Sequence, residues 1–118
     1  MRIHHLAFRT FDLPALTRFY CDVLGLKQRE VRPNGSVWLA AGDAILMLEA
    51  ATEGEPMVTA GSMDFLSFRI SPSDRDGVIE ALARAGVAVE AESDFTIYVR
   101  DPDGRRVGVS HFPAPREG

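Results

Sequence analysis

Four polar side chains in strand-like segments are the candidates for chemistry. His5 could ligate a divalent metal or hydrogen-bond a ligand, or be a polar residue in solvent. Glu49 could be a proton-transfer base or recognise a cation, although a solvated charge at a strand end is the simpler interpretation. Arg9 and Arg69 occupy equivalent places in two similar segments, so they could clamp an anionic ligand or remain charges at the rim of a site.

Two aromatic residues, Trp38 and Tyr98, lie in segments that could line a cavity and stack on a planar ligand. Subtracting their positions gives 98 − 38 = 60, whereas part of the sequence repeats at an interval of 61, which matches Trp38 to position 99. Because side chains alternate along a strand, we expect at most one of the two rings to face inward at equivalent depth. Burial beneath a helix or at a subunit contact is the alternative.

The sequence lacks the motifs for phosphate binding, for nucleophilic catalysis and for thiol redox chemistry. We find no Gly-rich phosphate loop, no Ser-His-Asp arrangement and no Cys-x-x-Cys, and the single Cys21 cannot form an internal disulfide. The net charge of −4 argues against a nucleic-acid partner and would suit a cationic ligand. No apolar run approaches membrane-spanning length, and the opening Met-Arg-Ile-His-His lacks the apolar core of a signal peptide. We therefore expect a cytoplasmic protein with no membrane partner.

The chain repeats one plan twice. His5-Leu6-Ala7-Phe8-Arg9 is similar to Phe65-Leu66-Ser67-Phe68-Arg69, and Gly25-Leu26 to Gly86-Val87. We predict one domain, 1–118, made of module one at 1–50, a linker at 51–62, module two at 63–112 and a tail at 113–118 that we expect to be frayed.

The sequence pattern of each module predicts the element order β-α-β-β-β. In module one a strand at 2–10 precedes a helix capped by Asp12 and ended by Gly25, and strands follow at 26–32, 36–41 and 44–49. In module two the strand at 63–70 precedes a helix, for which Ser73 and Asp76 resemble a capping box; Gly86 ends it, and strands follow at 87–92, 95–100 and 105–111. Each sheet would have one face under its helix and one free face, so pairing two modules or two chains would create a cupped cavity for a ligand.

The order of elements, the length and several motifs resemble the vicinal oxygen chelate superfamily of glyoxalases, bleomycin-resistance proteins and extradiol dioxygenases. The matching motifs are His5-Leu6-Ala7-Phe8, Asp12-Leu13, residues 19–26, and Asp101-Pro102-Asp103-Gly104 before the last strand. The resemblance implies an α+β fold of two tandem βαβββ modules, a homodimer, and, in the enzymes, one divalent metal in the groove. The ligands are implied on the first and last strands of each module: His or Gln, Glu, His, then Glu.

Few of those ligands are present. His5 matches the first position, but Phe65 stands at the third and Gly108 at the fourth. For the second, 108 − 61 = 47 selects Met47, whereas Glu49 lies one pleat further along the same face. Met47 and Phe65 favour an apolar pocket floor over a hydrated ion. In regular strands His111 and His4 would each face the side opposite to the implied ligands. A dimer interface could still use His4.

These observations predict a metal-free protein that binds a small organic molecule, similar to the bleomycin-resistance type, through residues chosen from one list: His5, Arg9, Trp38, Met47, Glu49, Phe65, Arg69 and Tyr98. The alternative is a lyase, isomerase or dioxygenase using Ni, Zn, Mn or Fe held by His5 and Glu49. A third hypothesis is a structural or interaction protein whose cavity is filled by its own side chains.

Overall fold

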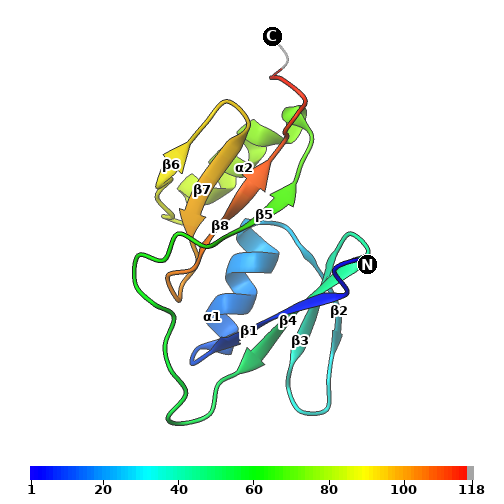
Figure 1. Ribbon diagram of the computed structural model, residues 1–118, viewed down its shortest axis with the longest axis vertical. Helices are drawn as coiled ribbons and strands as arrows, with labels where there is room; N and C mark the ends of the chain where they lie inside the picture. Colours follow the sequence, from blue (N-terminus) through cyan, green and yellow to red (C-terminus); the bar gives the residue numbers. More distant parts are fainter. Residues whose placement is uncertain (117–118) are drawn as a thin grey trace. The chain divides into compact units, whose positions relative to one another are not determined.

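The computed structural model describes residues 1–116, which form two compact units (Figure 1). The first unit is Met1–Met57 and the second begins at Val58. Their boundary falls inside the linker predicted at 51–62. Each unit holds one βαβββ module, and we describe the two units separately.

Module one is a four-stranded sheet with a helix on one face. The elements are β1 (His5–Thr10), α1 (Leu13–Arg18), a π-helical turn (Phe19–Val23), β2 (Lys27–Val31), β3 (Val37–Ala41) and β4 (Ala44–Ala50). The strand order is β1-β4-β3-β2, with β1 parallel to β4 and the other neighbours antiparallel. The first and last strands of the module are therefore neighbours, as the ligand pattern of the resemblance requires.

Local sequence signals account for the helix of module one. The Asp12 carboxylate accepts a hydrogen bond from the Ala15 N–H at 3.0 Å and caps α1, as predicted. The helix widens into the π turn before Gly25, whose φ of +82° suits glycine and ends the element. The core beneath the helix is formed by fully buried residues: Leu16, Tyr20, Leu39, Leu46 and Leu48.

Module two repeats the arrangement. Its elements are β5 (Phe65–Arg69), a 3₁₀ turn (Pro72–Asp74), α2 (Arg75–Arg84), β6 (Ala91–Glu92), β7 (Thr96–Arg100) and β8 (Arg106–Ser110), with strand order β5-β8-β7-β6. Figure 1 shows α2 along one face of this sheet. The core contains a set of residues that are at most 3% exposed: Leu82, Ile97, Val99, Val107 and Val109. The α+β fold of two tandem βαβββ modules is confirmed.

Two local predictions for module two are wrong. The capping interaction joins Ser71 to Asp74, whose carboxylate accepts from the Ser71 N–H at 3.1 Å, because the 3₁₀ turn starts before the predicted cap at Ser73. The strand predicted at 87–92 shortens to Ala91–Glu92, since only those two residues pair with β7. At the start of the predicted tail, the Ala114 N–H donates to the His111 carbonyl at 2.8 Å. Residues 117–118 of the predicted tail lie outside the described residues.

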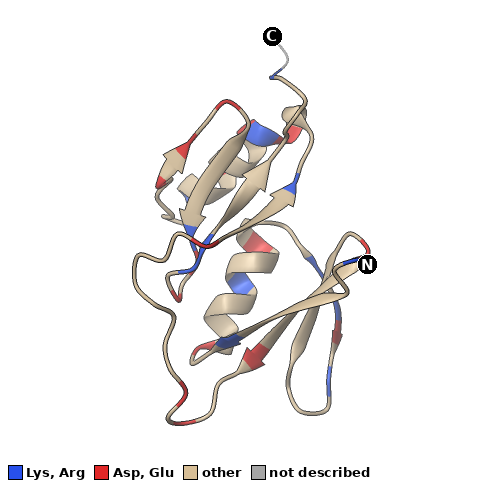
Figure 2. Ribbon diagram, viewed as in Figure 1, with Lys and Arg blue, Asp and Glu red and all other residues tan. Residues whose placement is uncertain are grey.

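Both signs of charge occur on the strands, helices and loops of each unit (Figure 2). Among residues 1–116, no helix combines the length and apolar character needed to span a bilayer.

Candidate functional site

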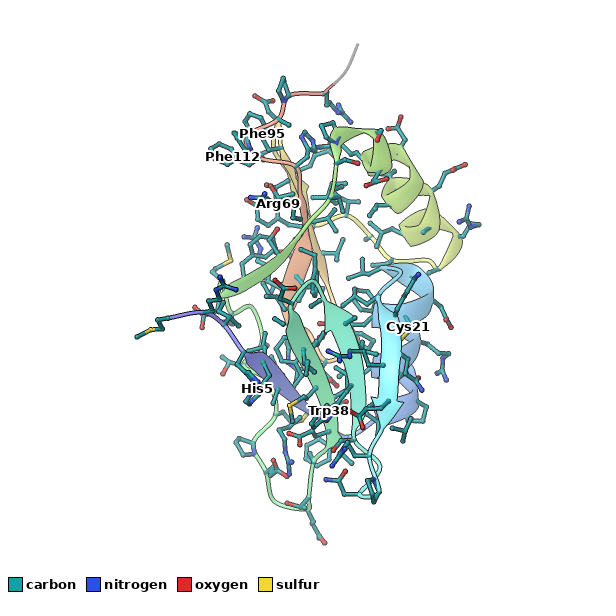
Figure 3. The ribbon with its side chains drawn as sticks, turned by 90° about the vertical axis from the view of Figure 1, so that its right-hand side faces the viewer. His5, Cys21, Trp38, Arg69, Phe95 and Phe112 are labelled. Atoms are coloured by element: carbon teal, nitrogen blue, oxygen red, sulfur yellow. The ribbon has the colours of Figure 1, made fainter. Side chains whose placement is uncertain are left out.

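The free face of module one is the side of its sheet turned away from α1. Pairing aligns His5 with Ile45, Ala7 with Met47 and Arg9 with Glu49, and Met47 also pairs with Trp38. Residues paired across a sheet share a face, so these side chains all belong to the free face. The alternate residues, such as Leu46 and Leu48, are buried on the other side. Figure 3 shows His5 on β1 and Trp38 on β3.

The free face of module two has the same construction. Pairing aligns Phe65 with Arg106, Ser67 with Gly108 and Arg69 with Ser110. Gly108 also pairs with Tyr98, which places the Tyr98 ring on the free face. In Figure 3 Arg69 lies on the side of this sheet away from α2.

Trp38 and Tyr98 both belong to free faces, so the prediction that at most one faces inward is wrong. Trp38 pairs with Met47, and Tyr98 pairs with Gly108. Eight residues separate the first pair in sequence and nine separate the second, because the turn between β7 and β8 carries one more residue. The repeat interval is therefore 60 between Trp38 and Tyr98 and 61 between Met47 and Gly108, so the interval of 61 at Gly25 and Gly86 does not extend to Tyr98.

Phe65 and Tyr98 form an aromatic pair on the free face of module two. Their ring centroids are 4.5 Å apart with an interplanar angle of 41°, and both residues are half-buried. The Arg106 guanidinium lies over the Tyr98 ring, 4.2 Å from its centroid, in cation–π geometry. Glu90 lies 3.5 Å from Arg106 Nε and forms an ion pair with that guanidinium. The face therefore offers a partly exposed apolar surface edged by charge.

Gly108 has no room for a side chain. A Cβ built there would lie 2.9 Å from the Ile97 carbonyl carbon, closer still to the Ile97 oxygen, and 3.3 Å from Phe65 Cε1. The Phe65 ring thus covers the glycine, an arrangement in which an aromatic side chain shields an otherwise bare stretch of strand.

Trp38 contributes the comparable aromatic surface in module one. The Arg32 guanidinium lies 5.0 Å from the centre of its indole. The indole Nε1 is buried and has no hydrogen-bond partner in the described part of the chain. Met47 is half-buried beside it on β4, so the middle of this free face is apolar.

The two arginines of the predicted clamp differ in their surroundings. Arg9 donates two hydrogen bonds to Glu55, from Nε at 2.9 Å and from Nη2 at 2.8 Å, and its Nη1 lies 3.7 Å from Glu49. Hydrogen bonding from Arg9 is the main cause that lowers the pKa of Glu55 to about 2, and the Thr52 N–H adds to it. Arg69 is exposed and has no hydrogen bond or ion pair within residues 1–116. Internal carboxylates thus already engage one member of the clamp.

His5 and Glu49 are not brought together. His5 is exposed and its Nδ1 lies 2.8 Å from Nδ1 of His4, while Glu49 lies beside Arg9. His5 pairs with Ile45, four residues before Glu49, so the two positions are roughly 13 Å apart along the sheet. The two side chains therefore do not converge on one point.

The four positions at which the resemblance implies metal ligands can be compared directly. Met47 pairs with Ala7 as Gly108 pairs with Ser67, so Met47, not Glu49, is the counterpart of Gly108. Three of the four positions then carry Met47, Phe65 and Gly108, and the last excludes even a Cβ. Within the described residues no three His, Cys, Asp or Glu side chains form a group suited to an ion. The residues present do not fit the implied metal.

Sequence reasoning missed one buried ionic centre, at Arg75. This residue is 2% exposed, and its guanidinium donates to the Ser93 carbonyl at 3.0 Å and to the Asp94 carbonyl at 3.4 Å. It also lies 3.0 Å from Nε2 of His111, which is 2% exposed and so faces the core, as its position in the strand predicted. Charged residues are seldom fully buried, so no sequence signal distinguished Arg75 from the other arginines.

A hollow of about 480 Å³ borders this centre and is lined by Arg75, Glu92, Ser93, Asp94, Phe95, Pro115 and Arg116. Both Arg75 Nη groups already make hydrogen-bond contacts, with the Ser93 and Asp94 carbonyls and with His111. The remaining Arg75 nitrogen, Nε, is buried and so is not accessible to a ligand in the hollow. The lining carries charges of both signs, because Glu92 and Asp94 are acidic and Arg116 is basic. The centre therefore pins the β6–β7 loop to the end of β8, and we place the candidate site on the free faces.

Comparison with known proteins agrees with this fold. The chain is 28% identical to the virulence protein STM3117 of Salmonella typhimurium, over 94% of this chain and 84% of that protein. A glyoxalase/dioxygenase from Nostoc punctiforme has a similar structure, with a TM-score of 0.79 and 23% identity over 96% of this chain and 92% of that chain. The structure of the fosfomycin resistance protein FosX of Mesorhizobium loti is also similar, with a TM-score of 0.74 and 19% identity over 92% of this chain and 90% of that chain. The family model of the Glyoxalase/Bleomycin resistance protein/Dioxygenase superfamily matches residues 2–109, and the chain belongs to that superfamily.

Proposed function

We propose that this protein binds a small organic molecule against the free faces of its sheets and does so without a metal, in the manner of a bleomycin-resistance protein. The observation that carries the proposal is the Phe65 ring lying over Gly108. Where the enzymes of the superfamily carry ligating side chains, this chain has an aromatic ring and a bare glycine. The position is therefore suited to apolar contact.

The surrounding side chains support apolar recognition. Phe65 and Tyr98 are half-buried in module two, and Trp38 and Met47 are half-buried in module one. Covering exposed aromatic surface is favourable by roughly 25 cal/mol per Å² of apolar area removed from water. Aromatic rings also stack on planar ligands with little loss of side-chain freedom.

The test combines metal content with ligand binding. We expect the full chain, purified without chelator or metal-affinity resin, to carry well under one Ni, Zn, Mn or Fe per chain. We also expect it to bind the neutral planar probe 2-naphthamide in isothermal titration calorimetry, with amide shifts at Ser67 and Gly108 in NMR spectra. Phe65→Ala should weaken that binding by about tenfold, because the ring supplies contact area.

Phe11→Ala is the matched control, because Phe11 is 56% exposed and lies after β1, outside the free face. Near-stoichiometric metal, or 2-naphthamide binding that is lost on metal removal, would overturn the proposal. So would the absence of any binding by small planar molecules.

The metal-dependent alternative has no supporting observation, because His5 and Glu49 lie in rows roughly 13 Å apart. The homodimer and the cytoplasmic location remain predictions. Light scattering after size-exclusion chromatography would measure the mass in solution against the 13.0 kDa chain.

A further inference from the structure

We infer that the free face of module two selects a planar organic anion, with Arg69 holding the anionic group. The inference rests on the proposed function, because it assumes that this face binds a ligand, and it adds the ligand's charge and its anchor.

The charge of this face supports an anion. Three guanidinium groups belong to it, those of Arg69, Arg100 and Arg106, because their positions pair in register on the same side of the sheet. The carboxylate that meets them is Glu90, which accepts two hydrogen bonds from Arg100 and lies 3.5 Å from Arg106. Arg69 is left with no ion-pair partner in residues 1–116.

Ser110, which pairs with Arg69, adds a hydrogen-bond donor to the same row. Its Oγ accepts from Thr96 Oγ1 at 2.9 Å and from the Phe112 N–H at 3.2 Å. A hydroxyl has one proton to donate, and that of Ser110 has no acceptor among the described residues. Arg69 and Ser110 thus both present donors, which is the chemistry that a carboxylate or sulfonate takes.

The spacing fits a planar molecule with its charge at one end. Gly108 lies two residues before Ser110 on β8, roughly 7 Å along the strand, and it pairs with Tyr98. A fused aromatic ring stacked against the Phe65–Tyr98 pair would set a carboxylate at the Arg69 row. Gly108 adds no side chain of its own, so the apolar surface beside Tyr98 is the Phe65 ring that covers the glycine.

Module one offers no equivalent anchor. Its counterpart of Arg69 is Arg9, which Glu55 and Glu49 already engage, and Glu49 stands where module two has Ser110. The net charge of −4, which alone favours a cation, acts over distances that physiological salt screens within about 8 Å. The local donors therefore decide the preference.

The experiment compares three probes of one shape on the full chain by calorimetry: 2-naphthoate, neutral 2-naphthamide and cationic 2-naphthylmethylamine. We expect 2-naphthoate to bind about tenfold more tightly than 2-naphthamide, the effect of one charge-assisted anchor. Arg69→Gln should remove that advantage, so that 2-naphthoate binds no more tightly than 2-naphthamide. Arg84→Gln, which removes an exposed cation from α2 of the same module, should change neither affinity.

The outcomes separate this inference from the proposed function. Equal affinities for the acid and the amide, an Arg69→Gln variant that keeps the advantage, or tighter binding of the amine would overturn the inference while the proposed function stands. Failure of all three probes to bind would overturn both.

Discussion

Replacing Gly108 by alanine should destabilise the protein strongly, although the change adds one methyl group. The new Cβ would lie 2.9 Å from the Ile97 carbonyl carbon and closer to its oxygen, against ordinary contacts of 3.4 Å or more. Backbone atoms cannot rotate away, so β7 and β8 must separate. Overpacking costs about 1–3 kcal/mol, and a clash with backbone belongs at the upper end, so we expect a loss of about 3 kcal/mol.

Gly77→Ala is the matched control. Gly77 lies inside α2 with nothing within 4 Å of its added Cβ, so the same chemical change should stabilise the protein by about 0.5–1 kcal/mol. Urea unfolding followed by circular dichroism measures both variants.

A loss below 1 kcal/mol for Gly108→Ala would refute the packing described for the free face of module two. The double variant Phe65→Ala/Gly108→Ala sharpens the test. The closest atoms belong to the Ile97 backbone and not to the Phe65 ring, so removing the ring should not rescue stability.

Three further predictions concern groups outside the free face of module two. Hydrogen bonds from Arg9 first, and then from Thr52, lower the pKa of Glu55 from 4.5 to about 2, so the stability from these contacts is present above pH 4.5 and is lost as the pH falls through about 2. Arg9→Gln should move the Glu55 midpoint toward 4.5 in a carboxyl NMR titration, and an unchanged midpoint would contradict the assignment. Arg75→Gln should cost about 3 kcal/mol in urea unfolding because it removes a buried guanidinium from His111 and from the Ser93 and Asp94 carbonyls, whereas exposed Arg84→Gln should change stability by less than about 0.5 kcal/mol. Asp12→Ala should cost about 1 kcal/mol through loss of the α1 cap, and no change would show that the cap is not needed.

The sequence was sufficient for the architecture because the repeat, the glycine stops and the alternation of apolar residues all point to the same fold. It was less reliable where a single residue shifts the register. The interval of 61 between Gly25 and Gly86 falls back to 60 at Trp38 and Tyr98, so applying 61 to Trp38 selected position 99 and placed Tyr98 on the wrong face. A change of one residue reverses which face a side chain occupies, so sequence spacing alone could not settle that point.

The sequence predicted which residues of the candidate site lie on the free faces, but not which of their side chains contact one another. His5, Met47 and Phe65 lie on the free faces that their alternation predicted. The capture of Arg9 by Glu55 could not be foreseen, because it joins positions 46 residues apart through a linker without periodicity. Position 108 has no room for a side chain because the Ile97 backbone of β7 passes close to it, and sequence spacing does not reveal that approach.

The lone indole of this chain gives it a built-in optical reporter. Trp38 is the one tryptophan, its ring nitrogen is buried without a hydrogen-bond partner in the described residues, and a guanidinium stands 5.0 Å from its centre. Tryptophan emission therefore originates in module one alone, and a ligand that displaces Arg32 or reaches the ring nitrogen would change its intensity and wavelength. Stopped-flow records of that emission would follow arrival and departure at this face in real time, without a dye or an engineered label.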